Sequence, residues 1–225
     1  MAGKSAKPSS IRTSLTRPSL SQSASPKTIA SRIVAIEPRF QAVVDFAGPS
    51  PIGRSPRRES NFASLATSIL SQQLSTKAAA TIISRVEVAS GGISPARISK
   101  ISSRTLKSCG VSGAKVRALK ELAAADREYS FSRLHQIKDD DEIFARLLPI
   151  FGVGKWTVEM FLIFQLGRAD IWPTGDLGVR RGFEQIHQMR SEITPKELER
   201  RGEIFRPWRS HVAWYCWRAI DMSRS

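Results

Sequence analysis

The stretch Leu147–Val179, LLPIFGVGKWTVEMFLIFQLGRADIWPTGDLGV, decides how this chain folds. Gly152 and Gly154 predict a tight turn, because glycine accepts positive φ and lets backbone segments approach closely. The helix expected after the turn is apolar nearly all the way round, so we expect it to be buried. The chain then passes through a Pro- and Gly-containing break and presents one carboxylate, Asp176. The stretch therefore predicts a rigid, buried helix that supports an acid in an irregular loop.

Charge and composition indicate a polyanionic partner. The 225 residues include 35 Lys and Arg against 20 Asp and Glu, which gives a net charge of +15 and a pI near 10.7. Such a charge favours nucleic acid, although ribosome-associated and membrane-surface proteins share it. Cys109 and Cys216 form neither a CxxC nor a Cys/His cluster, which argues against a disulfide framework, a zinc site and an iron–sulfur cluster. No apolar run approaches the roughly 18 residues of a membrane span, so we expect no membrane partner.

The N-terminal segment differs in composition from the rest of the chain. Residues 1–28 are rich in Ser, Lys, Arg and Pro, and the first acid of the chain is Glu37. We expect residues 1–28 to be a disordered basic tail that adds non-specific DNA affinity. The alternative is a transit peptide, which has the same kind of composition.

Helical periodicity dominates from Pro38 onward and predicts an all-α protein of about nine or ten short helices. Asp139 with Glu142, and Thr194 with Glu197, form capping-box patterns at two helix starts. The longest expected helical segments are 61–70, its continuation after a break over 78–86, and 106–125 with two glycine interruptions.

The glycine turn is also a candidate phosphate site. Gly154 lies at the start of the buried helix, where free N–H groups and the helix dipole attract an anion. Lys155 adds a positive charge beside them. The alternative for Gly152 and Gly154 alone is an ordinary connection between two packed helices.

These motifs together carry a family resemblance. Leu-Pro-x-Phe-Gly-Val-Gly-Lys-Trp-Thr, at 148–157, is followed about twenty residues later by Trp-Pro-Thr-Gly-Asp-Leu-Gly, at 172–178. This pattern resembles the helix-hairpin-helix DNA glycosylase superfamily, and most closely its alkylation-repair branch, 3-methyladenine DNA glycosylase II. Ile69–Ser75 (ILSQQLS) and Arg206–Ser210 (RPWRS) also resemble segments of that branch. The resemblance runs from about residue 38 to about 221, without the N-terminal β-rich lobe of some members.

The resemblance implies a two-lobed all-α fold with the active-site cleft between the lobes. Residues 29–225 would form this glycosylase domain, with the hairpin at about 147–157 and the Gly/Pro loop and acid at 172–176. It also implies a monomer that binds double-stranded DNA containing damaged bases. No metal is expected on side chains and no cofactor is needed, apart from a monovalent cation that hairpin main-chain carbonyls could hold. The protein would work in the cytoplasm (nucleoid) of a bacterium, or in the nucleus or an organelle of a eukaryote.

Asp176 is the expected catalytic residue. Cleavage of a bond between base and deoxyribose passes through a transition state with positive charge on the sugar, which a carboxylate in a dry site stabilises. The same acid can position or deprotonate the attacking water. The structural alternative is an N-cap on the helix expected from Leu177 to Ile186, and both roles are compatible.

The residue at position 156 predicts the reaction subtype. Bifunctional relatives of the resembled superfamily carry a nucleophilic Lys two positions after the second hairpin glycine, where this chain has Trp156. Lys155 is one residue away, which rotates it by about 100° around the helix toward a backbone phosphate. We therefore expect a monofunctional enzyme with no lyase activity. The absence of a four-cysteine cluster also argues against the endonuclease and adenine-mismatch branches.

The expected base pocket combines Trp156, Met160 and Trp217. Alkylation at N3 or N7 places a positive charge on a purine, which attracts it to aromatic faces. Core packing is the alternative for each tryptophan. Met160 and Leu177 stand where the resembled branch has aromatics, so the range of accepted bases could be narrower.

The break between residues 70 and 76 is the expected DNA wedge. An extracted base leaves a gap in the stack, and in the resembled superfamily this loop fills it. Gln73 is the first candidate and Leu74 the second, against the alternative that the glutamines are only solvated. A second hairpin-like segment, Cys109–Lys115, could bind the opposite flank of the lesion.

The sequence therefore predicts a DNA glycosylase that removes alkylated bases, such as 3-methyladenine and 7-methylguanine, in base excision repair. One alternative is a glycosylase for oxidised or deaminated bases. The other is a helix-hairpin-helix module that binds DNA without chemistry, although such a module needs neither Asp176 nor a Trp beside the hairpin.

Overall fold

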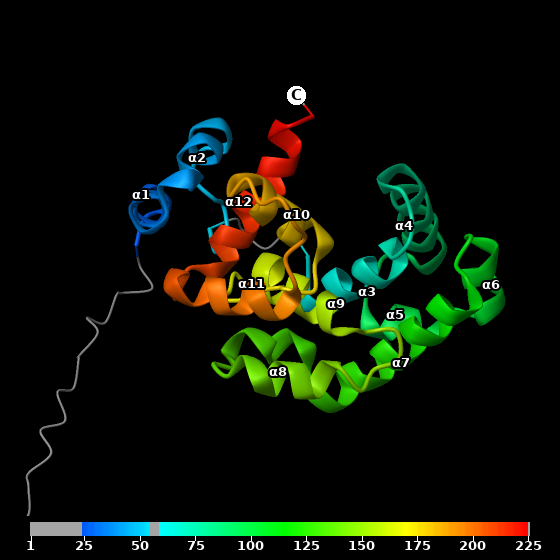
Figure 1. The fold of residues 1–225 in the computed structure, drawn as a ribbon. Helices are drawn as coiled ribbons and strands as arrows, with labels where there is room; N and C mark the ends of the chain where they lie inside the picture. Colours follow the sequence, from blue (N-terminus) through cyan, green and yellow to red (C-terminus); the bar gives the residue numbers. More distant parts are fainter. Residues whose placement is uncertain (1–23, 55–58, 225) are drawn as a thin grey trace, which may run out of the picture.

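The computed structural model describes residues 24–54 and 59–224, and every regular element in these two ranges is helical (Figure 1). The all-α prediction is therefore confirmed. The α-helices of these ranges are α1 (Pro26–Ile36), α2 (Gln41–Ala47), α3 (Asn61–Ser71), α4 (Thr76–Ser90), α5 (Pro95–Lys100), α6 (Ser103–Ser108), α7 (Gly113–Tyr129), α8 (Asp140–Leu147), α9 (Lys155–Met160), α10 (Leu177–Ile186), α11 (Pro195–Gly202) and α12 (Arg209–Met222). Short 3-10 helices are η1 (Pro38–Phe40), η2 (Phe131–Gln136) and η4 (Glu203–Phe205), and η3 (Phe161–Gln165) is a π-helix.

Twelve α-helices in the described ranges exceed the nine or ten expected from periodicity. Part of the excess lies in α5 and α6, which have six residues each and are too short to show a hydrophobic period. Their start signals are local, because Ser94 and Ser102 accept hydrogen bonds from the backbone N–H groups of Arg97 and Thr105.

The two capping-box acceptors occupy the expected positions. Asp139 accepts from the N–H of Asp141 at 3.0 Å, and Thr194 accepts from the N–H of Glu197 at 3.2 Å. The acid of each box makes other contacts than a capping box predicts: Glu197 binds Arg200 and Arg201, and Glu142 pairs with Arg146. The acids of the first turn therefore act as salt-bridge partners of basic residues one turn along.

Two hydrophobic cores divide the described residues into two lobes. One core is built from α3 to α9, and the other from α1, α2, α10, α11 and α12. The chain starts in the second lobe, crosses to the first between α2 and α3, and returns after η3, so the N- and C-terminal helices share a lobe (Figure 1). Trp214 and Trp217 of α12 pack against both cores and join the lobes.

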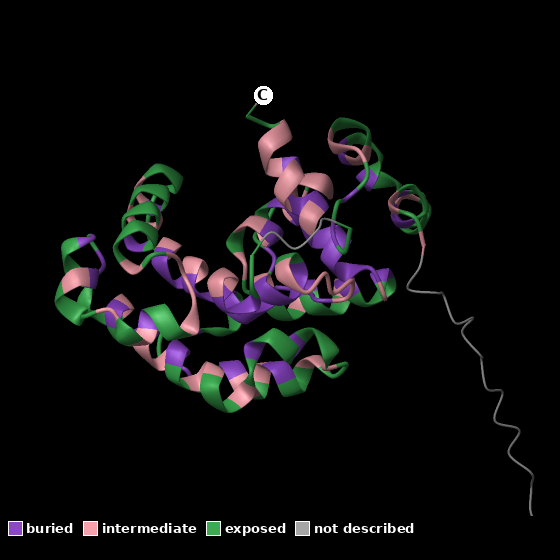
Figure 2. Ribbon diagram, turned by 180° about the vertical axis from the view of Figure 1, so that it is seen from behind, coloured by how far each residue is buried: buried purple, intermediate pink, exposed green. Residues whose placement is uncertain are grey.

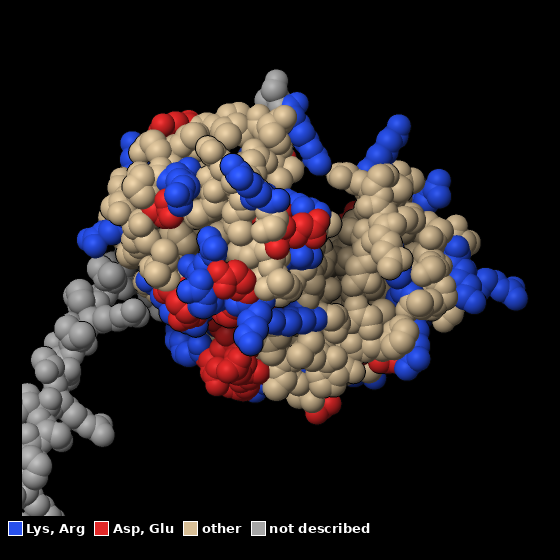
Figure 3. Space-filling model, in the orientation of Figure 1, with Lys and Arg blue, Asp and Glu red and all other residues tan. Residues whose placement is uncertain are grey.

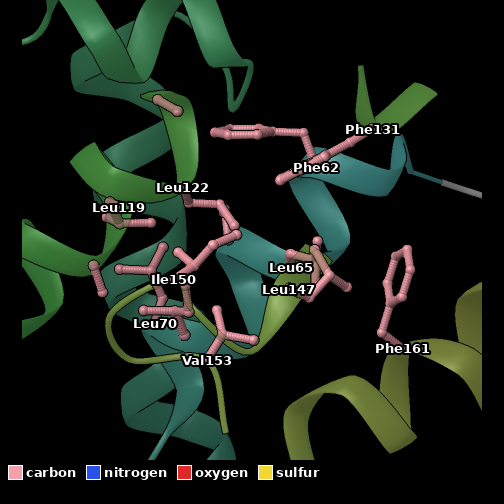
Figure 4. Packing of buried hydrophobic residues seen from close by; sticks show 14 of the residues in the cluster. Phe62, Leu65, Leu70, Leu119, Leu122, Phe131, Leu147, Ile150, Val153 and Phe161 are labelled. Atoms are coloured by element: carbon pink, nitrogen blue, oxygen red, sulfur yellow. The ribbon is translucent and has the colours of Figure 1, made fainter. Parts of the chain in front are cut away.

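The hairpin between α8 and α9 is anchored in the first core. Ile150 and Val153 are 6% and 4% exposed and pack among leucines of α3, α7 and α8 (Figure 4). Gly152 has φ 82°, and a Cβ on it would lie 2.7 Å from the Cβ of Ala118 in α7. Buried residues line the inward faces of the helices, whereas α4 is mostly exposed (Figure 2). The hairpin therefore has a rigid base and an exposed tip.

The expected N-terminal tail lies mainly outside the described residues, which begin at residue 24. Helix α1 starts at Pro26, capped by Ser25, so the helical part begins before the predicted boundary at residue 29. Among the helices of the described ranges, none is both long and apolar enough to cross a membrane.

Candidate active site and DNA interface

Asp176 is the N-cap of α10. Its Oδ1 accepts a hydrogen bond from the N–H of Val179 at 2.8 Å, as the capping interpretation predicted. The loop before it is held by its own turn, because the N–H of Asp176 donates to the carbonyl of Pro173 at 2.9 Å. The buried indole of Trp172 anchors the start of the loop by donating to the carbonyl of Leu198 at 2.9 Å. The carboxylate therefore has a fixed position, as a preorganised charge requires.

Two tryptophan indoles bind the same carboxylate. Trp156 Nε1 donates to Asp176 Oδ2 at 2.6 Å, and Trp217 Nε1 donates to Asp176 Oδ1 at 2.9 Å. Trp156 comes from α9 in the first lobe, whereas Asp176 and Trp217 come from the second. The candidate catalytic acid thus lies where the lobes meet, which confirms the predicted position of the cleft. Figure 3 shows a hollow between the lobes, walled mainly by uncharged residues, with Lys and Arg side chains and some Asp and Glu side chains at its edges.

Gly178 makes the second of these contacts possible. A Cβ at this position would lie 2.9 Å from Trp217 Cδ1 and 3.1 Å from Asp176 Oδ1. Any larger residue at position 178 would therefore push the indole of Trp217 away from the carboxylate.

A cavity of about 680 Å³ opens beside this cluster, between the end of α3, the loop that follows it, and α9. Its lining includes Trp156 and Met160, the predicted pocket residues, together with Gln73 and Leu74, the predicted wedge. The volume lies within the usual range for small-ligand pockets. Trp217 does not line this cavity and contacts the site through Asp176.

Phe164 is an exposed aromatic that the sequence reading missed. Its ring lies 5.6 Å from that of Trp217 with a 32° tilt, and the residue is 56% exposed. The apolar run from Phe161 predicts burial throughout, but η3 is a π-helix, whose extra residue per turn moves Phe164 off the buried face. No periodicity in the sequence signals such a change.

The wedge loop between α3 and α4 is fastened from two sides. Lys115 Nζ donates to the carbonyls of Leu70 and Gln72, both at 2.7 Å, and burial lowers the pKa of Lys115. From the other side, Gln72 Nε2 donates to the carbonyl of Gly152 at 3.0 Å. Gln73, with φ 57°, is left exposed at the tip, and Leu74 is 38% exposed.

One residue of the second hairpin-like segment, which could bind the opposite flank of the lesion, has an internal role. Lys115 at its end turns inward and supports the wedge loop through the two carbonyls of α3 and its C-cap.

The two hairpin glycines serve different purposes. Gly152 has the expected positive φ, but Gly154 has φ −95° and ψ 170°, so the prediction of positive φ is wrong for Gly154. Gly154 is the N-cap of α9 and makes no side-chain capping bond, and a Cβ there would meet nothing within 4 Å. Its missing side chain therefore leaves open space in front of the helix N-terminus.

Lys155 pairs with a buried acid of its own helix. Lys155 Nζ lies 3.6 Å from Glu159 Oε1, and the side chains are 70% and 5% exposed. Burial raises the pKa of Glu159 to about 6, and the charges of Asp176 and Glu199 act in the same direction. The burial of Glu159 was not predicted, because a Glu four residues after a Lys is usually part of a solvated helix face.

Residues 24–54 and 59–224 contain no cluster of His, Cys, Asp or Glu side chains that could hold a metal ion. Cys109 and Cys216 are both buried free thiols.

Comparison with known proteins agrees with this geometry. The family described as HhH-GPD superfamily base excision DNA repair protein matches residues 66–207, and the chain belongs to this superfamily. The chain is 30% identical over 197 residues to DNA-3-methyladenine glycosylase 1 of Schizosaccharomyces pombe, covering 84% of this chain and 85% of that protein.

Two solved structures show the same fold at similar identity. The DNA-3-methyladenine glycosidase of Bacillus halodurans is 30% identical with a TM-score of 0.76, covering 89% of this chain and 92% of that one. A 3-methyladenine DNA glycosylase of S. pombe, solved with abasic DNA, is 30% identical with a TM-score of 0.74, covering 84% and 94%.

Proposed function

We propose that this protein is a monofunctional DNA glycosylase that hydrolyses the N-glycosidic bond of alkylated bases, 3-methyladenine above all. The observation that carries the proposal is Asp176, fixed between the lobes and bordering, through Trp156, a cavity large enough for a base. The similarity to 3-methyladenine glycosylases over most of the chain supports the substrate class.

In this mechanism, the hairpin and the wedge hold the DNA while the base leaves the stack. The open N-terminus of α9 at Gly154 receives a phosphate, which the exposed Lys155 also attracts. Gln73, with Leu74 beside it, fills the space vacated by the base. The base enters the cavity next to Trp156 and Met160.

The chemical step depends on the carboxylate. Positive charge develops on the sugar as the bond to the base breaks, and Asp176 stabilises this charge and orients the attacking water. An alkylated purine is already a cation and a good leaving group, so the protein needs to supply little acid catalysis to the base.

The absence of lyase activity is part of the proposal. Trp156 places an indole N–H, which is not a nucleophile, 2.6 Å from Asp176 where a lyase would need an amine. Lys155 is instead paired with Glu159, with its Nζ 3.6 Å from Glu159 Oε1.

A monovalent cation in the hairpin is compatible with the donors present. Main-chain carbonyl oxygens suit a hard cation. The carbonyl of Gly152 accepts one hydrogen bond from Gln72 and keeps a second lone pair, so it could hold the ion together with other carbonyls of the turn.

Incubation of the full chain with methylated double-stranded DNA, followed by chromatography of released bases, tests the proposal. We expect release of 3-methyladenine, and no release by Asp176→Asn. Release of only oxidised or deaminated bases from matched substrates would assign another lesion class, and DNA binding without any release would leave a non-catalytic module.

A further inference from the structure

The wall of the cavity opposite Trp156 and Met160 consists of hydroxyl side chains. Thr67, Ser68 and Ser71 of α3 line the cavity and are all half-buried. They occupy one face of α3, whose other face carries Leu65, Ile69 and Leu70 into the core. An extracted base would therefore have the indole, the thioether and the Thr157 hydroxyl of α9 on one side and the three α3 hydroxyls on the other.

The hydrogens of two of these hydroxyls are already used by the protein. Thr67 Oγ1 donates to the carbonyl of Ser64 at 3.0 Å, with Glu59 Oε2 at 3.4 Å as another acceptor. Ser71 Oγ donates to the carbonyl of Thr67 at 2.7 Å. A hydroxyl has a single hydrogen and two lone pairs. Thr67 and Ser71 therefore offer the cavity acceptors only.

Two nearby donors are committed in the same way. Gln72 Nε2 donates to the carbonyl of Gly152, and Trp156 Nε1 donates to Asp176. The hydroxyl of Ser68 makes no hydrogen bond to the part of the chain that the structure describes, so it can turn to donate or accept. The α3 wall as a whole has more acceptors than donors.

We propose that this wall reads the exocyclic amino group of the extracted purine, with Thr67 and Ser71 as its acceptors. A 6-amino group donates to these oxygens, whereas a 6-oxo group in the same place sets lone pairs against lone pairs. A buried polar edge without a partner is costly, and a site built around one hydrogen bond rejects the analogue that lacks it. The inference rests on the proposed function and adds a selection that is separate from the charge of the base.

Two free bases separate the effect of the hydrogen-bonding edge of the base from the effect of its charge. Free 3-methyladenine and free 3-methylhypoxanthine carry the same methyl group and are both neutral, but differ in the 6-amino and 6-oxo groups and in the imidazole N–H that only the 6-oxo base carries, so the wall substitutions below assign the difference. Their dissociation constants can be measured by quenching of tryptophan fluorescence, which requires no catalysis, and checked by inhibition of base release from methylated DNA. We expect the wild type to bind 3-methyladenine roughly tenfold tighter or more, the ratio that one hydrogen bond of ordinary strength gives.

Substitutions in the wall should reduce this ratio. Thr67→Val and Ser71→Ala each remove an acceptor with little change in shape, and each should bring the two constants to within about threefold. Thr81→Val is the matched control, because Thr81 Oγ1 also donates to a carbonyl of its own helix, that of Lys77, but lies in exposed α4 outside the cavity. It should leave the ratio unchanged.

The outcomes distinguish this inference from the proposed function. Release of methylated bases with equal affinity for the two free bases would keep the glycosylase and overturn the amino-reading wall. A tenfold preference in binding without release from DNA would support the wall and overturn the proposed reaction. A ratio that survives in both Thr67→Val and Ser71→Ala would also overturn the assignment to α3.

Discussion

Trp156 Nε1 lies 2.6 Å from Asp176 Oδ2, and the two residues belong to different lobes. Trp217 donates to the other oxygen of the same carboxylate from within the second lobe. Asp176 is thus held by side chains from both sides of the cleft. The position of the candidate catalytic acid therefore depends on how the lobes are packed, and the edges of both indoles are committed to that acid while their faces remain for other contacts.

Substitution of Asp176 should separate catalysis from helix capping. Asp176→Asn should lower the rate of base release by about 10²–10³ or more, because the transition state loses its charge partner. Its NH2 group would also face an indole N–H, donor against donor. Asp176→Ser is the matched control, because serine can still cap α10 and should keep the melting temperature, whereas Asp176→Ala should lose about 1 kcal/mol of stability. Single-turnover release and thermal melts check both effects, and activity within tenfold of wild type in Asp176→Ser would remove the carboxylate from the mechanism.

Borohydride trapping tests the monofunctional assignment. Reduction during turnover should give no covalent protein–DNA adduct, because Trp156 has no amine and Lys155 Nζ is paired with Glu159 Oε1 at 3.6 Å. Denaturing electrophoresis of the reduced mixture provides the measurement. An abundant adduct that disappears in Lys155→Ala would show that Lys155 is a nucleophile after all.

Alanine substitutions of the two hairpin glycines should affect different properties: Gly152→Ala the stability of the fold, and Gly154→Ala the binding of DNA. Gly152→Ala places a Cβ 2.7 Å from that of Ala118 at a positive φ, so it should destabilise the fold by about 1–3 kcal/mol. Gly154→Ala meets nothing within 4 Å and should leave the melting temperature near wild type. If a phosphate docks there, Gly154→Ala should weaken binding of damaged and undamaged DNA alike. Unchanged binding would place the phosphate elsewhere.

Glu159 predicts a pH dependence of stability. Burial raises its pKa from 4.5 to about 6 in the folded state, so the folded protein holds this proton more tightly than the unfolded chain. The resulting stabilisation is complete below pH 4.5 and is lost as the pH rises through 6. Glu159→Gln should therefore gain about 2 kcal/mol relative to wild type between pH 4.5 and pH 8.

Denaturant unfolding of both proteins at the two pH values measures the gain from Glu159→Gln. His211 also titrates in this pH range, and its contribution to stability changes in the opposite direction because burial lowers its pKa to about 4. Both proteins contain His211, so its contribution cancels in the difference. A difference that does not change with pH would mean that Glu159 is solvated.

The sequence predicted the parts of the site that local chemistry encodes. The glycines, the helix cap at Asp176 and the break after Ser71 each follow from the conformational needs of a few neighbouring residues. These features predicted where the functional elements lie along the chain.

Contacts between distant segments were not predictable in this way. How the helices pack determines three contacts: the hydrogen bonds of both indoles to Asp176, the support of the wedge loop by Lys115, and the ion pair of the buried Glu159. The exposure of Phe164 depends on a π-helix that leaves no mark on hydrophobic periodicity.

Substitutions at Trp217 test what the pocket reads. Its N–H donates to Asp176 and its ring lies 5.6 Å from that of Phe164. Trp217→Phe removes the hydrogen bond but keeps a ring, so it should slow release of charged and neutral bases by similar factors. Trp217 does not line the cavity next to Trp156 and Met160, so Trp217→Ala, which also removes the ring, tests whether this ring reaches an extracted base. A ring that stacks on the base contributes a further 1–3 kcal/mol or so. That further loss should be larger for 3-methyladenine than for neutral hypoxanthine, because only the cation gains from an aromatic face. Single-turnover release of both bases by the three proteins measures these losses, and equal further losses would make Trp217 a support for Asp176 rather than part of the base pocket.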